Sequence, residues 1–423
     1  MSQPALPLDA LKSAVAALPD NALSGLRQRA LVNFERTGFP LVRAENWKYT
    51  SLAPLIEIST DWLEAGAARE ASTDLDDSPL ELIEAHWLVI DNGRIDAGRV
   101  DKLDVAGVTV APLGASGTDS NFDWPLIDFN AALLEDGLSI RIDADVERPI
   151  GILIVDSASD AAAVSQSRVE IEVAANCSAR FIEYHRSVGA NPHYANTVVD
   201  VVARQGARVE YVRLQERARE HSQTARLSAL LQRDARLHHS AFDLGGKLIR
   251  NDLHIDIAEA GAEALFDGLY VAGDGQHIDN HTRVDHRVGP AVSRQEYRGI
   301  LKGKARCIWN GKAIVHDDAD GTDAEQANHN LLLSKNAEID AKPELEIYAD
   351  DVKCAHGTTV GQLDETALFY LRTRGLDKEH ATRVMTHAFA AEVVSRVPLT
   401  DLREHVTDVL EQRLGKLTDG DST

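Results

Sequence analysis

A cysteine and a histidine two residues apart, Cys354 and His356, are the side chains in this sequence best placed to do chemistry. Residues 347–360 include isoleucine, tyrosine and valine and are predicted to be extended. Side chains at i and i+2 of a strand point to the same face, so we expect the pair to lie side by side. A thiolate and a neutral imidazole are both good ligands for iron or zinc. The spacing therefore predicts a metal or sulfur site, with simple packing of the two side chains as the alternative.

Other kinds of catalytic site are poorly supported. Ten of the 16 histidines lie between residues 221 and 360, but no HExxH, CxxC or HxH pattern occurs, so none is predicted individually as a ligand. The Gly268–Gly275 stretch lacks the lysine of a P-loop, so we expect no ATP hydrolysis by this chain. A cysteine hydrolase is disfavoured because no glycine-rich oxyanion turn follows Cys354.

The bulk composition predicts a globular protein of the cytoplasm. The chain has 423 residues, of which 44% are hydrophobic and 26% charged, as in ordinary folded proteins. Its net charge of -23 disfavours nucleic acid and anionic membranes as partners. The sequence contains no secretory leader pattern and no run of 18 apolar residues, so no membrane span is expected. Three scattered cysteines predict free thiols rather than disulfides.

The N-terminal part is predicted to be helical and then to become β. Residues 8 to about 37 have a helical pattern, with Asn21 as a candidate cap and Gly38 as the end. Residues 65–80 are small, polar and acidic, as in a linker or surface loop. The segment His86–Ile90 reads as a strand that runs into an Asn-Gly turn.

A weak internal repeat in the middle of the chain predicts the central architecture. Units of an alanine, a charged residue and an apolar residue start at Ala179, Ala207, Ala235, Ala305 and Ala337, with a further copy near Ala262 or Ala264. The first three are 28 residues apart. Strands of fixed period with small residues at the bends are typical of a β-solenoid. We therefore expect a parallel β-helix over about residues 140–360, with a β-sandwich as the alternative.

The C-terminal part is predicted to form three helices. Asp364 and Asp377 are candidate caps of the first two, and the third runs from Thr400 to about Leu417. The packed faces are predicted to be Val384, Ala388, Ala391 and Val394 in the second helix and Leu402, Val406, Val409, Leu410 and Leu414 in the third. Such a unit either caps the solenoid end or docks a partner. The predicted regions are thus 1–80 (helices and linker), 81–360 (β-helix core) and 361–423 (C-terminal helices).

Several motifs make the chain resemble the SufB/SufD family of iron-sulfur cluster assembly scaffolds, and within it the SufD-type subunits. They are Arg43-Ala-Glu-Asn-Trp-Lys-Tyr-Thr50, Arg298-Gly-Ile-Leu-Lys-Gly303, Tyr348-Ala-Asp-Asp-Val-Lys-Cys-Ala-His-Gly357, Gly361-Gln-Leu-Asp-Glu365 and Leu368-Phe-Tyr-Leu-Arg-Thr-Arg-Gly375. The similarity is dense over the C-terminal 130 residues and looser before them. The small number of cysteines favours the SufD type over the SufB type.

The resemblance implies a right-handed parallel β-helix flanked by N-terminal and C-terminal helical regions. It implies a non-enzymatic scaffold subunit of the SUF system that pairs with a SufB-like subunit through its β-helix and binds a SufC-like ATPase through residues 361–423. Cys354 and His356 would lie at the SufB-SufD junction and help to hold transient iron or a nascent iron-sulfur cluster shared with the partner. Cys177 and Cys307 are expected to be buried strand residues.

Two alternatives stay open at this point. The chain could be a stand-alone thiol or metal-dependent enzyme built on a β-solenoid, which would act in isolation. It could also be a purely architectural homodimer, in which Cys354 and His356 only pack and hydrogen-bond. Activity of the isolated chain would separate the enzyme from the scaffold. Cluster formation that survives replacement of the pair would indicate the architectural homodimer.

Overall fold

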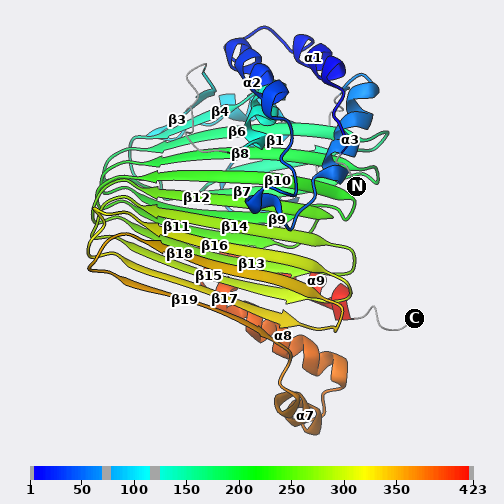
Figure 1. The fold of residues 1–423 in the computed structure, drawn as a ribbon, viewed down its shortest axis with the longest axis vertical. Helices are drawn as coiled ribbons and strands as arrows, with labels where there is room; N and C mark the ends of the chain where they lie inside the picture. Colours follow the sequence, from blue (N-terminus) through cyan, green and yellow to red (C-terminus); the bar gives the residue numbers. More distant parts are fainter. Residues whose placement is uncertain (1–3, 69–77, 115–123, 419–423) are drawn as a thin grey trace.

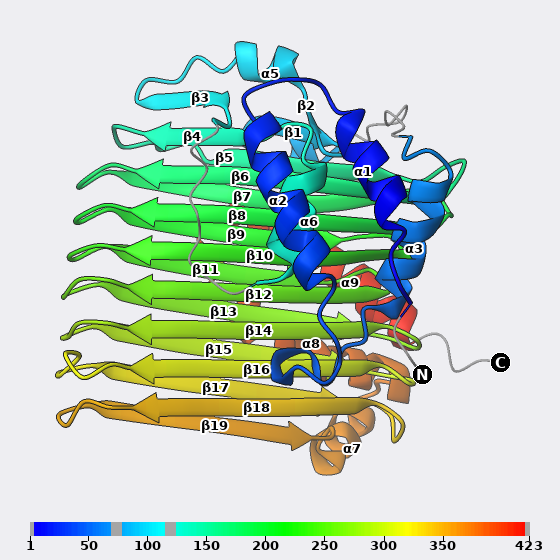
Figure 2. The ribbon, with the colours of Figure 1, turned by 45° about the horizontal axis from the view of Figure 1, so that its top comes forward.

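The fold is a parallel β-solenoid of two sheets with helices on both outer faces (Figures 1 and 2). It is taken from a computed structural model that describes residues 4–68, 78–114 and 124–418. Sheet A holds β1 (His86–Asp91), β2 (Arg94–Ile95), β5 (Ile150–Ser157), β7 (Ser178–Val188), β9 (Arg208–Glu216), β11 (Arg236–Asp243), β13 (Glu263–Ala272), β15 (Val292–Leu301), β17 (Asp323–Leu332) and β19 (Lys353–Gly361).

Sheet B is built from the strands that alternate with these. It holds β3 (Val108–Pro112), β4 (Leu138–Ile142), β6 (Ala163–Val173), β8 (His193–Ala203), β10 (His221–Leu231), β12 (Leu248–Ile257), β14 (His277–His286), β16 (Arg306–Val315) and β18 (Glu338–Ile347). From β4 onward each strand pairs in parallel with the strand two places ahead in the chain. This pairing confirms the predicted parallel β-helix and excludes the β-sandwich.

Helices surround the two sheets. They are α1 (Leu8–Ala16), α2 (Ser24–Thr37), the 3-10 turn η1 (Glu45–Trp47), α3 (Ala53–Glu64), α4 (Ser78–Leu82), α5 (Ala97–Asp101), α6 (Leu126–Leu133), α7 (Glu365–Thr373), α8 (Lys378–Val394) and α9 (Thr400–Thr418). The N-terminal helices and α6 pack on the outer face of sheet B, and α8 and α9 pack on that of sheet A. No helix within the described ranges is long and apolar enough to cross a membrane.

The repeat is real, but its alignment differs from the predicted one. The residues that stack between coils are Ala207, Ala235, Ala262 and Ala291, because each accepts a hydrogen bond from the residue that begins the next sheet A strand. Ala179 is two residues out of step, since it pairs with Val209. Ala305 and Ala337 precede β16 and β18 and so belong to the sheet B series.

Turn geometry explains the true period. In successive coils the residue before the small residue has a positive φ, at Asn176 (62°), Gly206 (68°), Asp234 (58°) and Gly261 (82°). The coil of Ala291 differs, because Pro290 precedes that alanine. Asparagine, aspartate and glycine tolerate this left-handed conformation better than other residues. The repeating signal is therefore a left-handed residue followed by a small one, which the predicted Ala-charged-apolar unit only partly captured.

The solenoid interior has an apolar part and a polar part. Along β7 the inward Phe181 belongs to the apolar core, whereas the next inward residue is Glu183, a buried carboxylate that accepts a hydrogen bond from Tyr211 Oη at 2.6 Å. On the next two coils, Arg213 Nη2 donates to Asp243 Oδ1 at 2.9 Å. Buried charges of this kind persist only when they are paired, so the polar part is a connected network.

Several local predictions are confirmed and several were wrong. Asp364 and Asp377 cap α7 and α8, accepting hydrogen bonds from the Thr366 and His380 N–H groups. The predicted stripe of α9 is buried throughout, from Leu402 to Leu414. The predicted stripe of α8 was wrong in part. Val394 is buried as predicted, but Val384 and Ala388 are exposed, and the helix also buries Ala381, Thr386, Ala390 and Val393.

The N-terminal region also differs in detail. The predicted helix over residues 8–37 is two helices, and α2 starts at Ser24, where the Asn21 side chain accepts from the Leu23 N–H instead of capping the helix. Gly38 ends α2 with a φ of 62°, as expected. Most of the predicted linker, residues 69–77, lies outside the described residues. The hairpin of β1 and β2 confirms the Asn-Gly turn.

Candidate functional site at the open end of the solenoid

The predicted pair lies on β19, the last strand of sheet A. Cys354 is opposite Ala324 of β17 and His356 is opposite Gln326. Ala324 and Gln326 are both buried inside the solenoid, so Cys354 and His356 share the inward-facing side of their strand. The prediction of one continuous strand from residue 347 was wrong, because β18 ends at Ile347 and the chain turns before β19 begins at Lys353. The side-by-side placement survives because both residues lie beyond the turn.

Cys354 is half-buried at the end of the core. It packs with Val352 against a small cluster of Val315, Ala319 and Ala349. Burial raises the pKa of the Cys354 thiol above its ordinary value, with a smaller opposing effect from the Ala324 N–H. The sulfur is therefore a neutral thiol at neutral pH, and a metal ion would have to displace its proton to bind.

His356 is exposed, and the amide of Gln326, which lies opposite it on β17, has its hydrogen-bond partners elsewhere. The buried Gln326 amide, oriented so that its nitrogen donates to Gly311 O at 3.1 Å and its oxygen accepts from Ala313 N at 3.0 Å, spans to β16 of the opposite sheet. No hydrogen bond to the His356 imidazole occurs among the residues that the structure describes. Its ring nitrogens are thus available to an incoming metal ion or partner.

The end of the solenoid around the pair is uncovered. β18 and β19 are the terminal strands of their sheets, and each pairs with one neighbour. The Lys353 N–H donates to the carbonyl of Thr322, the residue before β17, so the alternate N–H groups, including those of Cys354 and His356, face the free edge. Ile347, Tyr348 and Val360 are exposed there. An unpaired edge with apolar side chains is a surface for another chain, and the C-terminal helices do not cap it.

Of the C-terminal helices, α8 and α9 pack on sheet A, and α7 projects past β19 (Figure 1). Arg396, just after the end of α8, reaches sheet A, where its Nη1 donates to Asp267 Oδ1 at 2.5 Å. α7 buries none of its residues, and Phe369 and Tyr370 are 66% and 56% exposed. α8 and α9 are thus anchored on sheet A, and α7 exposes an aromatic surface, which favours the docking alternative for this region.

The remaining histidines and cysteines have structural surroundings. His238, His254 and His281 bond through Nε2 to Asp267, Asp285 and Asp279 at 2.8, 2.8 and 3.0 Å. Across residues 4–68, 78–114 and 124–418, no group of three or more His, Cys, Asp or Glu side chains is arranged to hold a metal ion. All three cysteines are free thiols, as predicted; Cys307 is fully buried, whereas Cys177 is only partly so.

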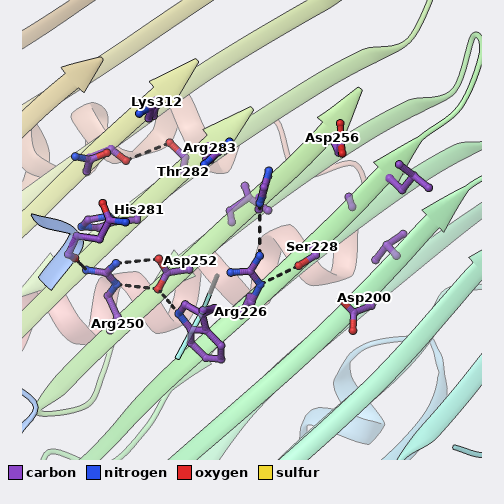
Figure 3. Close-up of a pocket in the computed structure, with 18 of the residues that line it drawn as sticks. Asp200, Arg226, Ser228, Arg250, Asp252, Asp256, His281, Thr282, Arg283 and Lys312 are labelled. Carbon is purple, nitrogen blue, oxygen red and sulfur yellow. Dashed lines mark hydrogen bonds and ion pairs between the residues drawn. The ribbon is translucent and has the colours of Figure 1, made fainter. Parts of the chain in front are cut away.

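The sequence did not predict a second feature, a groove of about 820 Å³ on the outer face of sheet B (Figure 3). Its lining comes from five successive strands, β8 to β16, and from the segments around Trp47 and Trp124. No local motif marks these residues, since they are far apart in the chain. These residues could have been grouped from the sequence only by aligning the coils and selecting the outward-facing positions of each strand.

Comparison with known proteins agrees with this architecture. Residues 154–389 match the family model described as "SUF system FeS cluster assembly, SufBD core domain". The chain is 29% identical over 399 residues to the iron-sulfur cluster assembly protein SufD of Escherichia coli (strain K12), which covers 92% of each chain. It is 28% identical over 426 residues to an iron-sulfur cluster assembly SufBD family protein of Synechocystis, covering 94% of this chain and 92% of the relative.

A third relative matches a shorter part. An iron-sulfur cluster assembly SufBD family protein of Mycobacterium leprae is 32% identical over 294 residues, or 68% of this chain and 73% of that protein. The family model covers more than half of the chain, from within β5 through the stacked coils to α7 and most of α8. The chain therefore belongs to the SufBD family of iron-sulfur cluster assembly proteins and is of the SufD type.

Proposed function

We propose that this protein is a scaffold subunit that pairs with a SufB-like subunit at the β18–β19 end and presents Cys354 and His356 to iron entering a nascent cluster. The observation that carries the proposal is the position of this pair, side by side on a strand with a free edge. A partner strand added to β19 would bring its own side chains next to both residues. Iron and the cluster are cargo here, held transiently while the complex is assembled.

The number of ligands supports a shared site. An iron-sulfur cluster usually has four thiolate or imidazole ligands, and the pair supplies two. The others would come from the facing subunit or from small thiols. The raised pKa of Cys354 fits an intermittent ligand, because the neutral thiol forms again when the metal leaves.

The ATPase activity is assigned to a separate SufC-like subunit. The sequence contains no P-loop, and the exposed Phe369 and Tyr370 of α7 offer an aromatic docking surface on the C-terminal region 361–423. The three free thiols and the net charge of -23 support a cytoplasmic protein whose partners are other proteins rather than nucleic acid or membranes.

The test is anaerobic co-expression of the chain with SufB-like and SufC-like partners, followed by iron and sulfide analysis of the purified complex. The variants are Cys354→Ala and His356→Ala, with Cys177→Ala as a matched loss of a thiol far from the site. We expect all complexes to assemble, and iron and sulfide to fall in the first two variants only.

Two outcomes would contradict the proposal. Equal iron and sulfide in every complex would make the pair structural and favour an architectural role. If the isolated chain catalysed a reaction without its partners, and Cys354→Ala abolished that activity, the result would instead favour a stand-alone enzyme.

A further inference from the structure

The two long C-terminal helices are attached to sheet A in different ways. α9 packs on the sheet through a stripe of large apolar side chains, from Leu402 to Leu414. α8 contributes the shorter Ala390, Val393 and Val394 to the same apolar layer. Apolar burial is not directional, so these short side chains by themselves define the position of α8 only loosely. Charged side chains near the C-terminal end of α8 supply the directional contacts.

Arg298 of β15 reaches from the sheet to the helix. Its Nη1 donates to the Phe389 carbonyl at 3.2 Å, its Nη2 donates to the Glu392 carboxylate, and its Cζ lies 4.9 Å from the centre of the Phe389 ring. Its Nε and Nη2 also donate to Glu296 Oε1 on the same strand, at 3.1 and 3.0 Å. The Arg298 side chain is only 10% exposed, so these interactions are screened less by salt than surface ion pairs are.

Arg396 makes the reverse connection, from the end of the helix to the sheet. Besides its bond to Asp267 of β13, its Nη2 donates to the Glu296 carboxylate of β15. Glu296 is therefore shared by two arginines, one from the sheet and one from the helical region. Arginine forks bond to carboxylates in fixed directions, so this network specifies both the position and the rotation of α8 on the sheet.

The position of α8 in turn affects that of α7. The two helices are joined by residues 374–377, and α7 buries none of its own residues. The exposed Phe369 and Tyr370 lie on α7, so the direction in which they face depends on where α8 is held.

We propose that Arg298 and Arg396 are positioning residues that hold α7 and α8 in the orientation to which the SufC-like ATPase subunit docks. This inference rests on the proposed function, in which Phe369 and Tyr370 form the docking surface. The arginines act without touching the ATPase subunit. If α8 kept this orientation in only about a tenth of the molecules, the apparent affinity for the subunit would fall about tenfold.

The experiment is isothermal titration calorimetry of the full-length protein with a purified SufC-like ATPase subunit. Arg298→Met and Arg396→Met should each weaken binding about tenfold or more. Arg294→Met is the matched control, because Arg294 lies on the same face of β15 but pairs with Asp323 and Glu325 of β17. The control should bind within about twofold of the wild type.

Hydrogen exchange separates positioning from direct contact with the partner. In the isolated chain, Arg298→Met should speed up exchange in α8 and leave the exchange of β15 and β17 unchanged. Pull-down with the SufB-like subunit should give the same result as for the wild type, because β19 is unaltered. If circular dichroism shows that Arg298→Met is unfolded, Arg298→Lys takes its place, since lysine keeps the charge but lacks the fork.

The outcomes distinguish this inference from the proposed function. If the wild type binds the ATPase subunit and Arg298→Met binds it within about twofold as tightly, only the positioning role is overturned. Weaker binding without faster exchange in α8 would also overturn it, because Arg298 would then act by touching the partner. Failure of the wild type to bind would refute ATPase docking on α7 itself, and the positioning role with it.

Discussion

Arg217 Nη1 donates to Asp156 Oδ2 over 2.5 Å, with both side chains fully buried inside the solenoid. The two residues come from different coils, since Asp156 is on β5 and Arg217 follows β9. Burial alone would raise the pKa of Asp156, but Arg217, His193 and a hydrogen bond from Ser165 hold it at about 2. The ion pair therefore stays charged at all physiological pH values and ties the coils together.

Removing one member of this pair should be strongly destabilising. Arg217→Met leaves Asp156 as a buried, unpaired carboxylate, and such changes cost about 3–5 kcal/mol. The double variant Asp156→Asn with Arg217→Met should regain part of the loss, because the isolated charge is gone. Urea unfolding followed by circular dichroism measures both effects. Arg208→Met, at an exposed position, is the control, and equal unfolding midpoints for the two arginine variants would refute the prediction.

Buried histidines in the same network should make the protein sensitive to mild acid. Burial lowers the pKa of His193 to about 3, that of His221 to about 4 and that of His239 to about 3. Histidine in the unfolded chain has a pKa near 6.5. Below about pH 6.5 these histidines are therefore protonated in the unfolded chain but stay neutral in the native state. The free energy of unfolding should then fall as the pH drops from about 6.5 towards 4.

Neighbouring carboxylates do not offset this effect in that range. Asp156 and Glu183 have pKa values of about 2 in the folded state, so the stability that they add is lost only below the unfolded carboxyl pKa of about 4. The measurement is the urea midpoint at pH 7.5, 6.0 and 5.0 in one buffer system. His193→Gln should flatten the dependence, and a midpoint that does not change between pH 7.5 and 5.0 would rule the effect out.

The two proposed interfaces should be separable by mutation. Ile347→Lys with Val360→Lys places charges at the open solenoid end and should abolish pairing with a SufB-like subunit while leaving the SufC-like ATPase bound. Phe369→Lys with Tyr370→Lys should have the opposite result, because both side chains lie on α7 and not on the edge strands β18 and β19. Pull-down with each tagged partner reads out both. If either double variant loses both partners, the two surfaces are not independent as proposed.

The packing of α8 and α9 on sheet A, which supports the proposed docking surface of α7, should depend on the apolar stripe of α9. Leu414 is fully buried against sheet A, and Leu414→Ala should cost about 2–5 kcal/mol through lost contacts and a cavity. Hydrogen exchange should speed up in α8 and α9 before it does in the solenoid coils. Gln412→Ala, at an exposed position of the same helix, serves as the control. Uniform exchange across helices and coils would show that α8 and α9 are not a separate unit of stability.

The sequence by itself determined the features that depend on local spacing. Cys354 and His356 share a face because side chains alternate along any strand. Asp364 and Asp377 cap helices because a carboxylate at the N-cap position accepts a hydrogen bond from an N–H group of the first turn, wherever the helix lies in the fold. The α9 stripe was also readable, since its helix is apolar on one face only. The solenoid itself was predictable from its period, although the alanine alignment missed the left-handed residue that sets each turn.

The tertiary structure decided everything that depends on how distant segments meet. The face of α8 that packs was predicted only in part, at Val394. Both sides of the helix carry alanine and valine, and packing on sheet A selects Ala390 and Val393 over Val384. No local signal shows that β19 is the last strand, with a free edge beside Cys354, because this follows from where the coils stop. The ion network at the end of α8 likewise exists only after the helix packs on sheet A, since Arg396 meets Asp267 and Glu296, which lie 129 and 100 residues earlier in the chain.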